Sequence, residues 1–329
     1  MSGAFASVRV RVVGGLVLVL PLLAALLAAG NGDGRASAGW QRHAPLPLAR
    51  TEVAAAVAGG ELVAVGGFLA DGATSARADA YSPSGNRWRR LPDLPVAVNH
   101  AMAASDGRRV YVVGGYAGAI DAGHAVRGAW VLDGGRWRTL PRPPERRAAG
   151  GAAIVGGLLY VVGGIGPNGL ARQTLVYDIG RRRWSPAPGP TPREHLAVTA
   201  AGGRIYALGG RLAGIDTNLG TLQSYSPGAR RWLDLSPVPH ARGGTGAAVL
   251  RGRIVSIGGE EPGGTISSVY AYDIATARWA QLDDLPTPRH GLGVATLGGR
   301  VYAVGGGPQP GLYVSDANES IAIDACVSQ

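Results

Sequence analysis

Five arginines stand at matching places in a repeating sequence, and each could bind a carboxylate through paired N–H donors. The last four are separated by steps of 46, 49 and 47 residues, and the first lies about two such steps earlier: Arg50, Arg147, Arg193, Arg242 and Arg289. Grouped around one axis, they would form an electropositive funnel for an acidic peptide or an acidic glycan. The alternative that the sequence leaves open is that each arginine binds carbonyl groups of its own repeat.

Four histidines lie close to these arginines: His100, His195, His240 and His290. Three or more imidazoles can hold a metal ion when their side chains meet. Because the four fall in different repeats at slightly different offsets, the sequence predicts that they do not converge on one ion. No metal and no other cofactor is therefore expected, and His195 and His290 are counted as candidates for ligand binding.

The residues that directly follow six glycine pairs form a second group of candidates: Phe68, Tyr116, Ile165, Arg211, Glu260 and Gly307. Tyr116 and Arg211 could contact the same ligand as the arginines. Glu260 offers a carboxylate beside that basic ring, and a carboxylate so placed can serve as a general base.

The elements that position these residues form six repeats. Each contains a short β-branched run that ends in two glycines, at 61–67, 109–115, 158–164, 204–210, 253–259 and 300–306, and the steps are 46 to 49 residues. A period near fifty residues is typical of repeat proteins. A small-residue run precedes each glycine strand, and a Tyr and a Trp usually follow it. We therefore expect four strands per repeat, a to d, with small residues near an axis and aromatic residues in the wider outer part.

The two ends of the repeat array complement each other. Trp40 precedes its glycine pair by 26 residues, as later Trp residues do, so it marks a strand d without strands a to c before it. At the other end, 319–324 reads as a strand c without a Trp after it. Pairing of these two segments would close six whole sheets into a ring without a free edge.

The glycine pairs, the Tyr before the c–d turn, the Trp seven residues later and the Pro-x-Pro-Arg segment resemble kelch repeats over residues 40–324. The resemblance implies an all-β, six-bladed propeller that acts as a binding module, and kelch domains use the arginine position for acidic partners. Exported bacterial propellers similar to N-acetylneuraminate epimerase carry a Gly-Glu pair that Gly259 and Glu260 match, although the Arg that follows it there is missing here. The alternative function is therefore sugar mutarotation or epimerisation by Glu260 with Arg211 or Arg242.

In such a propeller the d–a and b–c connections emerge on one face. The b–c loops are the longer ones, at 68–76, 116–127, 165–172, 211–220, 260–267 and 307–318. Long loops grouped at one end of a rigid scaffold are the usual place for recognition. We therefore place the binding site for a protein or glycan partner on this loop face.

The composition excludes several other classes of function. All 32 basic residues are arginine, so Schiff-base and P-loop lysine chemistry are excluded. The net charge of +10 would suit nucleic acid, but the aromatic residues among the basic ones have a structural role in the outer strands, and no nucleic acid partner is expected. The single Cys326 permits no intramolecular disulfide, and it lies too far outward for the Tyr–Cys copper chemistry of galactose oxidase.

The N-terminal segment 1–38 is expected to direct export. Arg9 and Arg11 precede an apolar run at 12–29, and Ala36-Ser37-Ala38 offers a cleavage site before Gly39. An uncleaved membrane anchor at 12–29 is the open alternative. The propeller at 39–329 would then be secreted, periplasmic or held at the cell surface, with the membrane contacted only through that segment.

Overall fold

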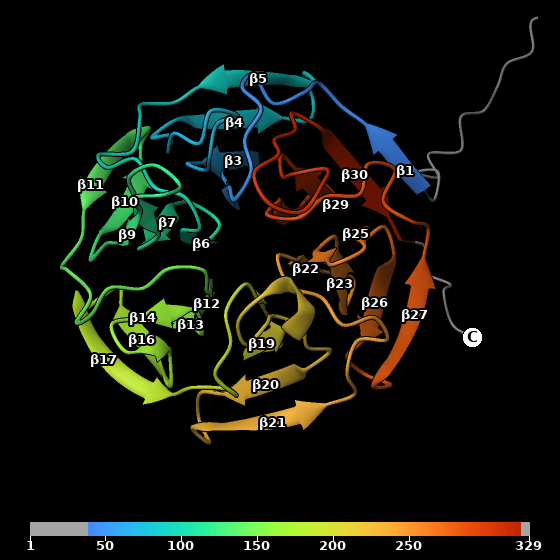
Figure 1. The fold of residues 1–329 in the computed structure, drawn as a ribbon. Coiled ribbons are helices and arrows are strands. Elements are labelled where there is room, and N and C mark those ends of the chain that lie inside the picture. The colour runs from blue at the N-terminus through green and yellow to red at the C-terminus, as the bar shows by residue number, and fades with distance from the viewer. Residues whose placement is uncertain (1–38, 324–329) are drawn as a thin grey trace, which may run out of the picture. The chain divides into compact units, whose positions relative to one another are not determined.

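The computed structural model describes residues 39–323, which form six four-stranded antiparallel sheets arranged in a ring around an axis (Figure 1). The six-bladed propeller expected from the repeats is thus confirmed. The expected signal peptide or anchor at 1–38 and Cys326 lie outside the described residues. Within 39–323, no helix is long and apolar enough to cross a membrane.

The blades follow one another along the chain, and each runs from an inner strand a to an outer strand d. The first three contain β2 (Ala54–Ala58), β3 (Glu61–Val65), β4 (Ala78–Ser82) and β5 (Arg87–Arg90); β6 (Met102–Ser105), β7 (Val110–Val113), β10 (Ala129–Asp133) and β11 (Arg136–Thr139); and β12 (Gly151–Val155), β13 (Leu158–Val162), β16 (Gln173–Asp178) and β17 (Arg183–Pro188).

The remaining blades contain β18 (Ala197–Ala201), β19 (Arg204–Leu208), β20 (Leu222–Ser226) and β21 (Arg231–Leu235); β22 (Gly246–Leu250), β23 (Arg253–Ile257), β26 (Val269–Asp273) and β27 (Arg278–Leu282); and β28 (Gly293–Leu297), β29 (Arg300–Val304), β30 (Asn318–Ala322) and β1 (Gly39–Arg42). The b–c loops add three small hairpins and one 3-10 turn: β8 (Tyr116–Ala117) with β9 (His124–Ala125), β14 (Ile165–Gly166) with β15 (Gly169–Leu170), β24 (Glu260–Glu261) with β25 (Gly264–Thr265), and η1 (Ile215–Thr217).

The ring closes through the N-terminal strand, as the sequence predicts. Strand β1 pairs antiparallel with β30, with Trp40 opposite Ile321. It thereby supplies strand d of the sixth blade, beside the outer edge of β30 in Figure 1. Both ends of the repeat array are thus tied into one sheet, and its outer strand comes from the start of the propeller.

Small residues line the axis because neighbouring inner strands approach closely. A Cβ atom at Gly151 would overlap the side chain of Val198 in the next blade, and one at Gly246 would overlap Val294. Tyr and Trp fill the outer, wider part of each wedge, where Tyr177 and Trp184 pack with ring centroids 5.0 Å apart. The size gradient of the sequence therefore follows the radial geometry.

Two sets of inter-blade hydrogen bonds repeat around the ring. Each strand-d indole N–H donates to a carbonyl of the preceding blade over 2.8–2.9 Å: Trp40 to Asp283, Trp88 to Ala44, Trp137 to Pro92, Trp184 to Pro141, Trp232 to Pro188 and Trp279 to Ser236. The second glycine of each pair donates its backbone N–H to the next blade over the same range: Gly67 to Val98, Gly115 to Arg147, Gly164 to Arg193, Gly210 to Arg242, Gly259 to Arg289 and Gly306 to Arg50.

Candidate functional site

The carbonyls that receive these glycine bonds define an equivalent place in every blade, which we name the cap position: Arg50, Val98, Arg147, Arg193, Arg242 and Arg289. The five arginines are fully buried, with at most 1% of each exposed. Arg147, for example, donates to the carbonyls of Gly163 and Gln173 at 2.8 and 3.1 Å. Burial lowers the pKa of Arg193 to about 10, so this side chain stays cationic at neutral pH.

The five arginines therefore cap their own blades, which is the alternative that the sequence left open. Arg50 and Arg289 also bind buried carboxylates, those of Asp79 and Glu319, each at 2.8 Å. None of the five lines the cavity described below. The electropositive funnel expected from them is not formed.

Two residues after the cap position, every d–a connection reaches the axis in a left-handed backbone conformation. We name this set the axial ring, and its φ values lie between 50° and 67°: Glu52, His100, Ala149, His195, Gly244 and Gly291. Four of the six are not glycine, although a left-handed conformation costs a residue with a Cβ about 1–3 kcal/mol. Such strained residues concentrate at functional sites.

Backbone hydrogen bonds join the axial ring from blade to blade. The N–H of His100 donates to the carbonyl of Glu52 at 3.1 Å, and the same step is repeated by Ala149, His195, Gly244 and Gly291. The N–H of Val53 donates to the carbonyl of Gly291 at 3.1 Å and completes the circle. The positions of these backbones are thus fixed independently of their side chains.

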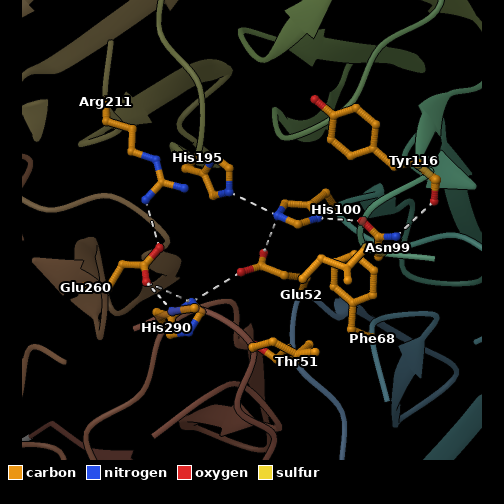
Figure 2. Close-up of a pocket in the computed structure, with 14 residues that line it drawn as sticks. Thr51, Glu52, Phe68, Asn99, His100, Tyr116, His195, Arg211, Glu260 and His290 are labelled. Atoms are coloured by element: carbon orange, nitrogen blue, oxygen red, sulfur yellow. Dashed lines mark hydrogen bonds and ion pairs between the residues drawn. The ribbon is translucent and has the colours of Figure 1, made fainter. Parts of the chain in front are cut away.

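A cavity of about 320 Å³ lies on the loop face beside the axial ring. Figure 2 shows the polar side chains that meet in it and the aromatic rings of Phe68 and Tyr116 at one side. The lining residues come from d–a connections and from b–c loops: Thr51, Glu52, Phe68, Asn99, His100, Tyr116, Ile120, Gly123, His195, Arg211, Glu260, His290, Gly311 and Leu312.

The two kinds of connection meet because of a bridge repeated in every blade. The residue after the cap position pairs with the residue after the glycine pair: Thr51 with Phe68, Asn99 with Tyr116, Ala148 with Ile165, Glu194 with Arg211, Gly243 with Glu260 and His290 with Gly307. The candidates that follow the glycine pairs are therefore held beside the axial ring, and three of them carry polar side chains into the cavity.

Glu52 lies at the centre of the polar cluster. Its Oε2 is 3.2 Å from Nε2 of His100, and its Oε1 is 3.2 Å from Nδ1 of His290. Burial opposes ionisation of Glu52, but three neighbouring histidines, His100, His290 and His195, outweigh it and hold the pKa of this carboxyl well below its usual range. Burial lowers the pKa of His100 to about 4, which leaves that imidazole neutral at neutral pH.

His290 has the opposite behaviour. Burial would lower its pKa, but hydrogen bonding to Glu52 and the charges of Glu52 and Glu260 raise it. Its Nε2 lies 3.0 Å from the carbonyl of Gln309, so both ring nitrogens have acceptors beside them. His290 therefore favours the protonated form.

Arg211 lies between two glutamates. Its Nε donates to Glu194 at 3.0 Å and its Nη1 donates to Glu260 at 2.7 Å. Burial would lower the pKa of Arg211, but the two carboxylates raise it. The side chain of Glu260 is only 5% exposed, and its Oε2 also accepts the N–H of Gly311 at 3.3 Å. The charge of Arg211 is thus balanced within the protein.

The structure brings together one part of the expected set and separates the rest. Six of the candidate residues line the cavity: Phe68, Tyr116, His195, Arg211, Glu260 and His290. His240 lies apart, with its Nε2 2.9 Å from Glu261. Glu52 was missed, although its position two residues after Arg50 repeats that of His195 after Arg193.

The expectation that the histidines do not converge is wrong for two of them. The Nε2 atoms of His100 and His195 lie 3.0 Å apart, because both residues occupy the axial ring. His100 stands two residues after Val98, which takes the cap position without being an arginine, so the shared offset has no arginine to mark it. Sequence alignment of the six blades on their glycine pairs would have revealed it.

Comparison with known proteins agrees with this fold. The model of the KLHDC2/KLHL20/DRC7 Kelch-repeats domain matches residues 142–306, and that of the Kelch motif matches residues 49–95. Kelch-like protein terF of Aspergillus terreus is 31% identical over 246 residues, which are 68% of this chain and 54% of that protein. Kelch-like protein 35 of Mus musculus is 30% identical over 201 residues, 60% of this chain and 33% of that protein.

Kelch-like protein 26 of Danio rerio is 26% identical over 224 residues, which are 67% of this chain and 29% of that protein. The chain thus spans about half or less of the length of these relatives. The first family model covers half of the chain, and the blades, glycine pairs and closing strand extend the same pattern over the described residues. The chain belongs to the kelch-repeat family.

Proposed function

We propose that this propeller is an exported binding module that takes a segment of a partner protein into the cavity of its loop face. Kelch-repeat domains generally serve as protein-interaction modules. The cavity volume of about 320 Å³ lies within the range of ligand pockets, about 300–1,000 Å³. It would admit one side chain or a chain end rather than a whole folded surface.

The distribution of exposed apolar side chains carries this proposal. Within 39–323, six large hydrophobic side chains are exposed, and five of them lie in d–a or b–c connections: Leu48, Val96, Ile120, Leu212 and Tyr313. The sixth, Leu233, lies in strand β21. Exposed apolar groups gathered on one face are typical of interaction surfaces. The loop face is therefore the part of the propeller best suited to a protein partner.

The chemistry of the cavity favours an apolar ligand group over an acidic one. The acidic peptide or glycan expected from the sequence depended on the cap arginines, which are buried inside the blades. At the cavity, Arg211 is already balanced by Glu194 and Glu260. Ile120, Phe68 and Tyr116 instead offer an apolar wall. We therefore specify a segment with an apolar side chain.

The cavity does not suit sugar epimerisation by Glu260 with Arg211 or Arg242. It requires a carboxylate that can reach the substrate and take a proton. Glu260 is 4% exposed and bound by Arg211, and Arg242 lies inside its blade. Neither residue is placed for that chemistry.

Export is proposed on the N-terminal sequence alone, from Arg9, Arg11, the apolar run 12–29 and the cleavage pattern before Gly39. Cell fractionation with N-terminal sequencing tests it. We expect the protein outside the cytoplasm, with a mature chain that begins at Gly39. An intact N-terminus in the membrane fraction would indicate the anchor, and a cytoplasmic protein would contradict export.

The binding proposal is tested by selecting peptides from a random phage-displayed library on the immobilised full-length chain, with a glycan array in parallel. We expect enriched peptides that share an apolar residue and lose about tenfold or more in affinity for the Ile120→Asp variant, because hot-spot contacts are worth about 2 kcal/mol or more. The matched control is Leu233→Asp, which places the same charge on an exposed leucine of β21. Binding equally reduced by both variants, or enrichment of glycans only, would contradict the proposal.

A further inference from the structure

Three electron-pair donors meet at the floor of the cavity, on the axial ring (Figure 2). They are Nε2 of His100, Nε2 of His195 and a carboxylate oxygen of Glu52, and all three lie within 4.8 Å of one another. The two imidazole nitrogens are 3.0 Å apart, and Oε2 of Glu52 is 3.2 Å from Nε2 of His100. Two ligands of a tetrahedral Zn²⁺ ion with bonds of about 2.0–2.1 Å lie about 3.3 Å apart. Two of the three spacings therefore match that of metal ligands, and the third pair, His195 and Glu52, lies within 4.8 Å.

Nδ1 of His100 contacts the side-chain amide of Asn99, and two other hydrogen bonds determine which way that amide faces. Nδ2 of Asn99 donates to the hydroxyl of Thr74 at 2.8 Å and to the backbone carbonyl of Tyr116 at 3.2 Å. Because that carbonyl can only accept, the NH₂ group must face it, and Oδ1 of Asn99 faces His100. The hydrogen of His100 is therefore on Nδ1, 2.6 Å from Oδ1, and its Nε2 presents a lone pair.

His195 is oriented less tightly. Its Nδ1 lies 3.1 Å from Oε2 of Glu194 but forms no hydrogen bond with it, and the other oxygen of Glu194 accepts from Arg211 at 3.0 Å. The nearby carboxylate favours a hydrogen on Nδ1, which leaves the lone pair of Nε2 toward His100. Metal-binding histidines are usually oriented by such a carboxylate or carbonyl on the outer nitrogen.

Glu52 is oriented as well. Its Oε1 contacts His290 at 3.2 Å, which leaves Oε2 toward His100. Two lone pairs at 3.0 Å and a carboxylate beside them repel one another unless a proton or a metal ion lies between them. The three side chains are each 10–14% exposed, so the cavity gives an ion access to them.

We propose that Glu52, His100 and His195 bind one divalent transition-metal ion, Zn²⁺ or a first-row ion of similar size, with a coordination position open to the cavity. Imidazole and carboxylate ligands suit such ions. Three protein ligands with an open fourth position can also bind a water molecule or a donor atom of a ligand. The site does not depend on the binding role proposed above. It would add a coordination bond to whatever enters the cavity.

The backbone supports this site by holding the three residues in place before an ion binds. All three belong to the axial ring, whose amides and carbonyls bond to one another rather than to the side chains. Their left-handed φ values of 50–53° are fixed by that ring. A rigid frame of this kind holds ligands within the small tolerance that metal binding requires.

Metal binding is tested on the full-length chain without a polyhistidine tag, after dialysis against a chelator. Isothermal titration calorimetry with Zn²⁺ and visible absorption with Co²⁺ are the measurements. We expect one ion per chain and a higher melting temperature with the ion, since a ligand that binds only the folded state stabilises it. We expect His100→Ala and His195→Ala to lose this binding, and Asn99→Ala to weaken it by about tenfold or more.

Two further variants keep the test decisive. Glu52→Gln retains the shape of the side chain but not its charge, and we expect it to bind the ion more weakly even where an alanine variant folds poorly. His240→Ala removes another histidine of the loop face and should leave affinity and stoichiometry unchanged. The proposal is overturned if neither ion binds the wild-type chain, or if binding persists in His100→Ala and His195→Ala variants that circular dichroism shows to be folded. A loss of binding in His240→Ala would place the ion elsewhere.

Discussion

The indole N–H of Trp40 donates to the backbone carbonyl of Asp283, 243 residues later in the chain, at 2.9 Å. It repeats a bond that the other strand-d tryptophans form between neighbouring blades, so the closing contact is chemically equivalent to the rest. We expect Trp40→Phe to lower the free energy of unfolding by about 1 kcal/mol, the usual contribution of a hydrogen bond. Chemical denaturation measures it.

Two comparisons make this prediction specific. Trp232→Phe removes the equivalent bond in the fourth blade and should cost a similar amount. Arg42 lies in the same strand as Trp40, and its side chain is 78% exposed beside Glu319. Arg42→Ala should therefore change the free energy of unfolding little. A Trp40→Phe protein as stable as the wild type would show that the closing strand contributes little.

A glycine can be required by a left-handed backbone alone, or also by the lack of space for a Cβ atom. Gly114, from a glycine pair, and Gly134, from a c–d turn, distinguish these two constraints. Both have left-handed backbones, with φ of +63° and +58°. A Cβ at Gly114 would overlap the carbonyl oxygen of Arg147, whereas nothing lies within 4 Å of one at Gly134. We expect Gly134→Ala to cost about 1–2 kcal/mol from the backbone alone. Gly114→Ala should cost clearly more, because the next blade must also move. Equal melting temperatures for the two variants would contradict this account.

Arg193 is predicted to act through stability and not through contact with a ligand. Its guanidinium donates to the carbonyls of Thr191 and Gly209 and to the side chain of Gln223, at 2.7–2.8 Å. Arg193→Ala removes the side-chain donor to the carbonyls of Thr191 and Gly209 and one of the two donors to Oε1 of Gln223. We expect a loss of about 3–5 kcal/mol, summed over these lost hydrogen bonds and the lost packing of a fully buried side chain. The exposed Arg183 of β17 is the matched control, since Arg183→Ala should change stability little. Thermal unfolding measures both, and an Arg193→Ala protein of wild-type stability would contradict the capping role.

Asp106 makes one turn of the second blade sensitive to acid. Burial raises its pKa, but hydrogen bonds from the backbone and side chain of Arg109 and from the backbone of Arg108 outweigh this and lower it below 3.8. Because the folded pKa is the lower one, the carboxylate stabilises the fold above 3.8 and loses this effect as the pH falls through the folded value. Asp106→Ala should therefore cost about 1–2 kcal/mol at pH 7 and progressively less in acid.

Melting temperatures of wild type and Asp106→Ala across pH 3 to 7 check this sign. The exposed Asp121 of a b–c loop serves as the control, and Asp121→Ala should run parallel to wild type. A gap between wild type and Asp106→Ala that widens in acid would contradict the assignment.

The fold could be predicted because its determinants are repeated. The spacing of Trp40 to its glycine pair has five later copies, so the missing strands at one end and the missing Trp at the other could be recognised without coordinates. Gly114 and its equivalents are identical for a steric reason that every blade shares. Repetition thus identified what the blades have in common.

The site could be predicted only in part, because a site depends on what the blades do not share. Arg193 and its equivalents recur for capping, and their recurrence made them resemble a binding ring. The axial ring changes from Glu52 to His100 and Ala149 along the chain, and in a single sequence this variation has no periodic signal. Arg211 and Glu260 were found because the glycine pairs mark their places. The offset of His100 appears only when the six blades are aligned on those pairs, and the contact of Glu194 with Arg211 appears only in the structure.

The axial ring has a further consequence, since hydrogen bonds between main-chain atoms run around it whatever side chains its members carry. Exchanging the side chain of one member removes none of the backbone hydrogen bonds of the axial ring. A blade can therefore carry a different functional group at this position while those bonds remain. An architecture with near-sixfold symmetry can in this way hold chemistry that has no symmetry at all. In this chain the acid and the two imidazoles occupy half of the places, and Ala149, Gly244 and Gly291 occupy the other half. A Cβ at Gly291 would overlap the carboxylate of Glu52, so a new group there would displace the acid.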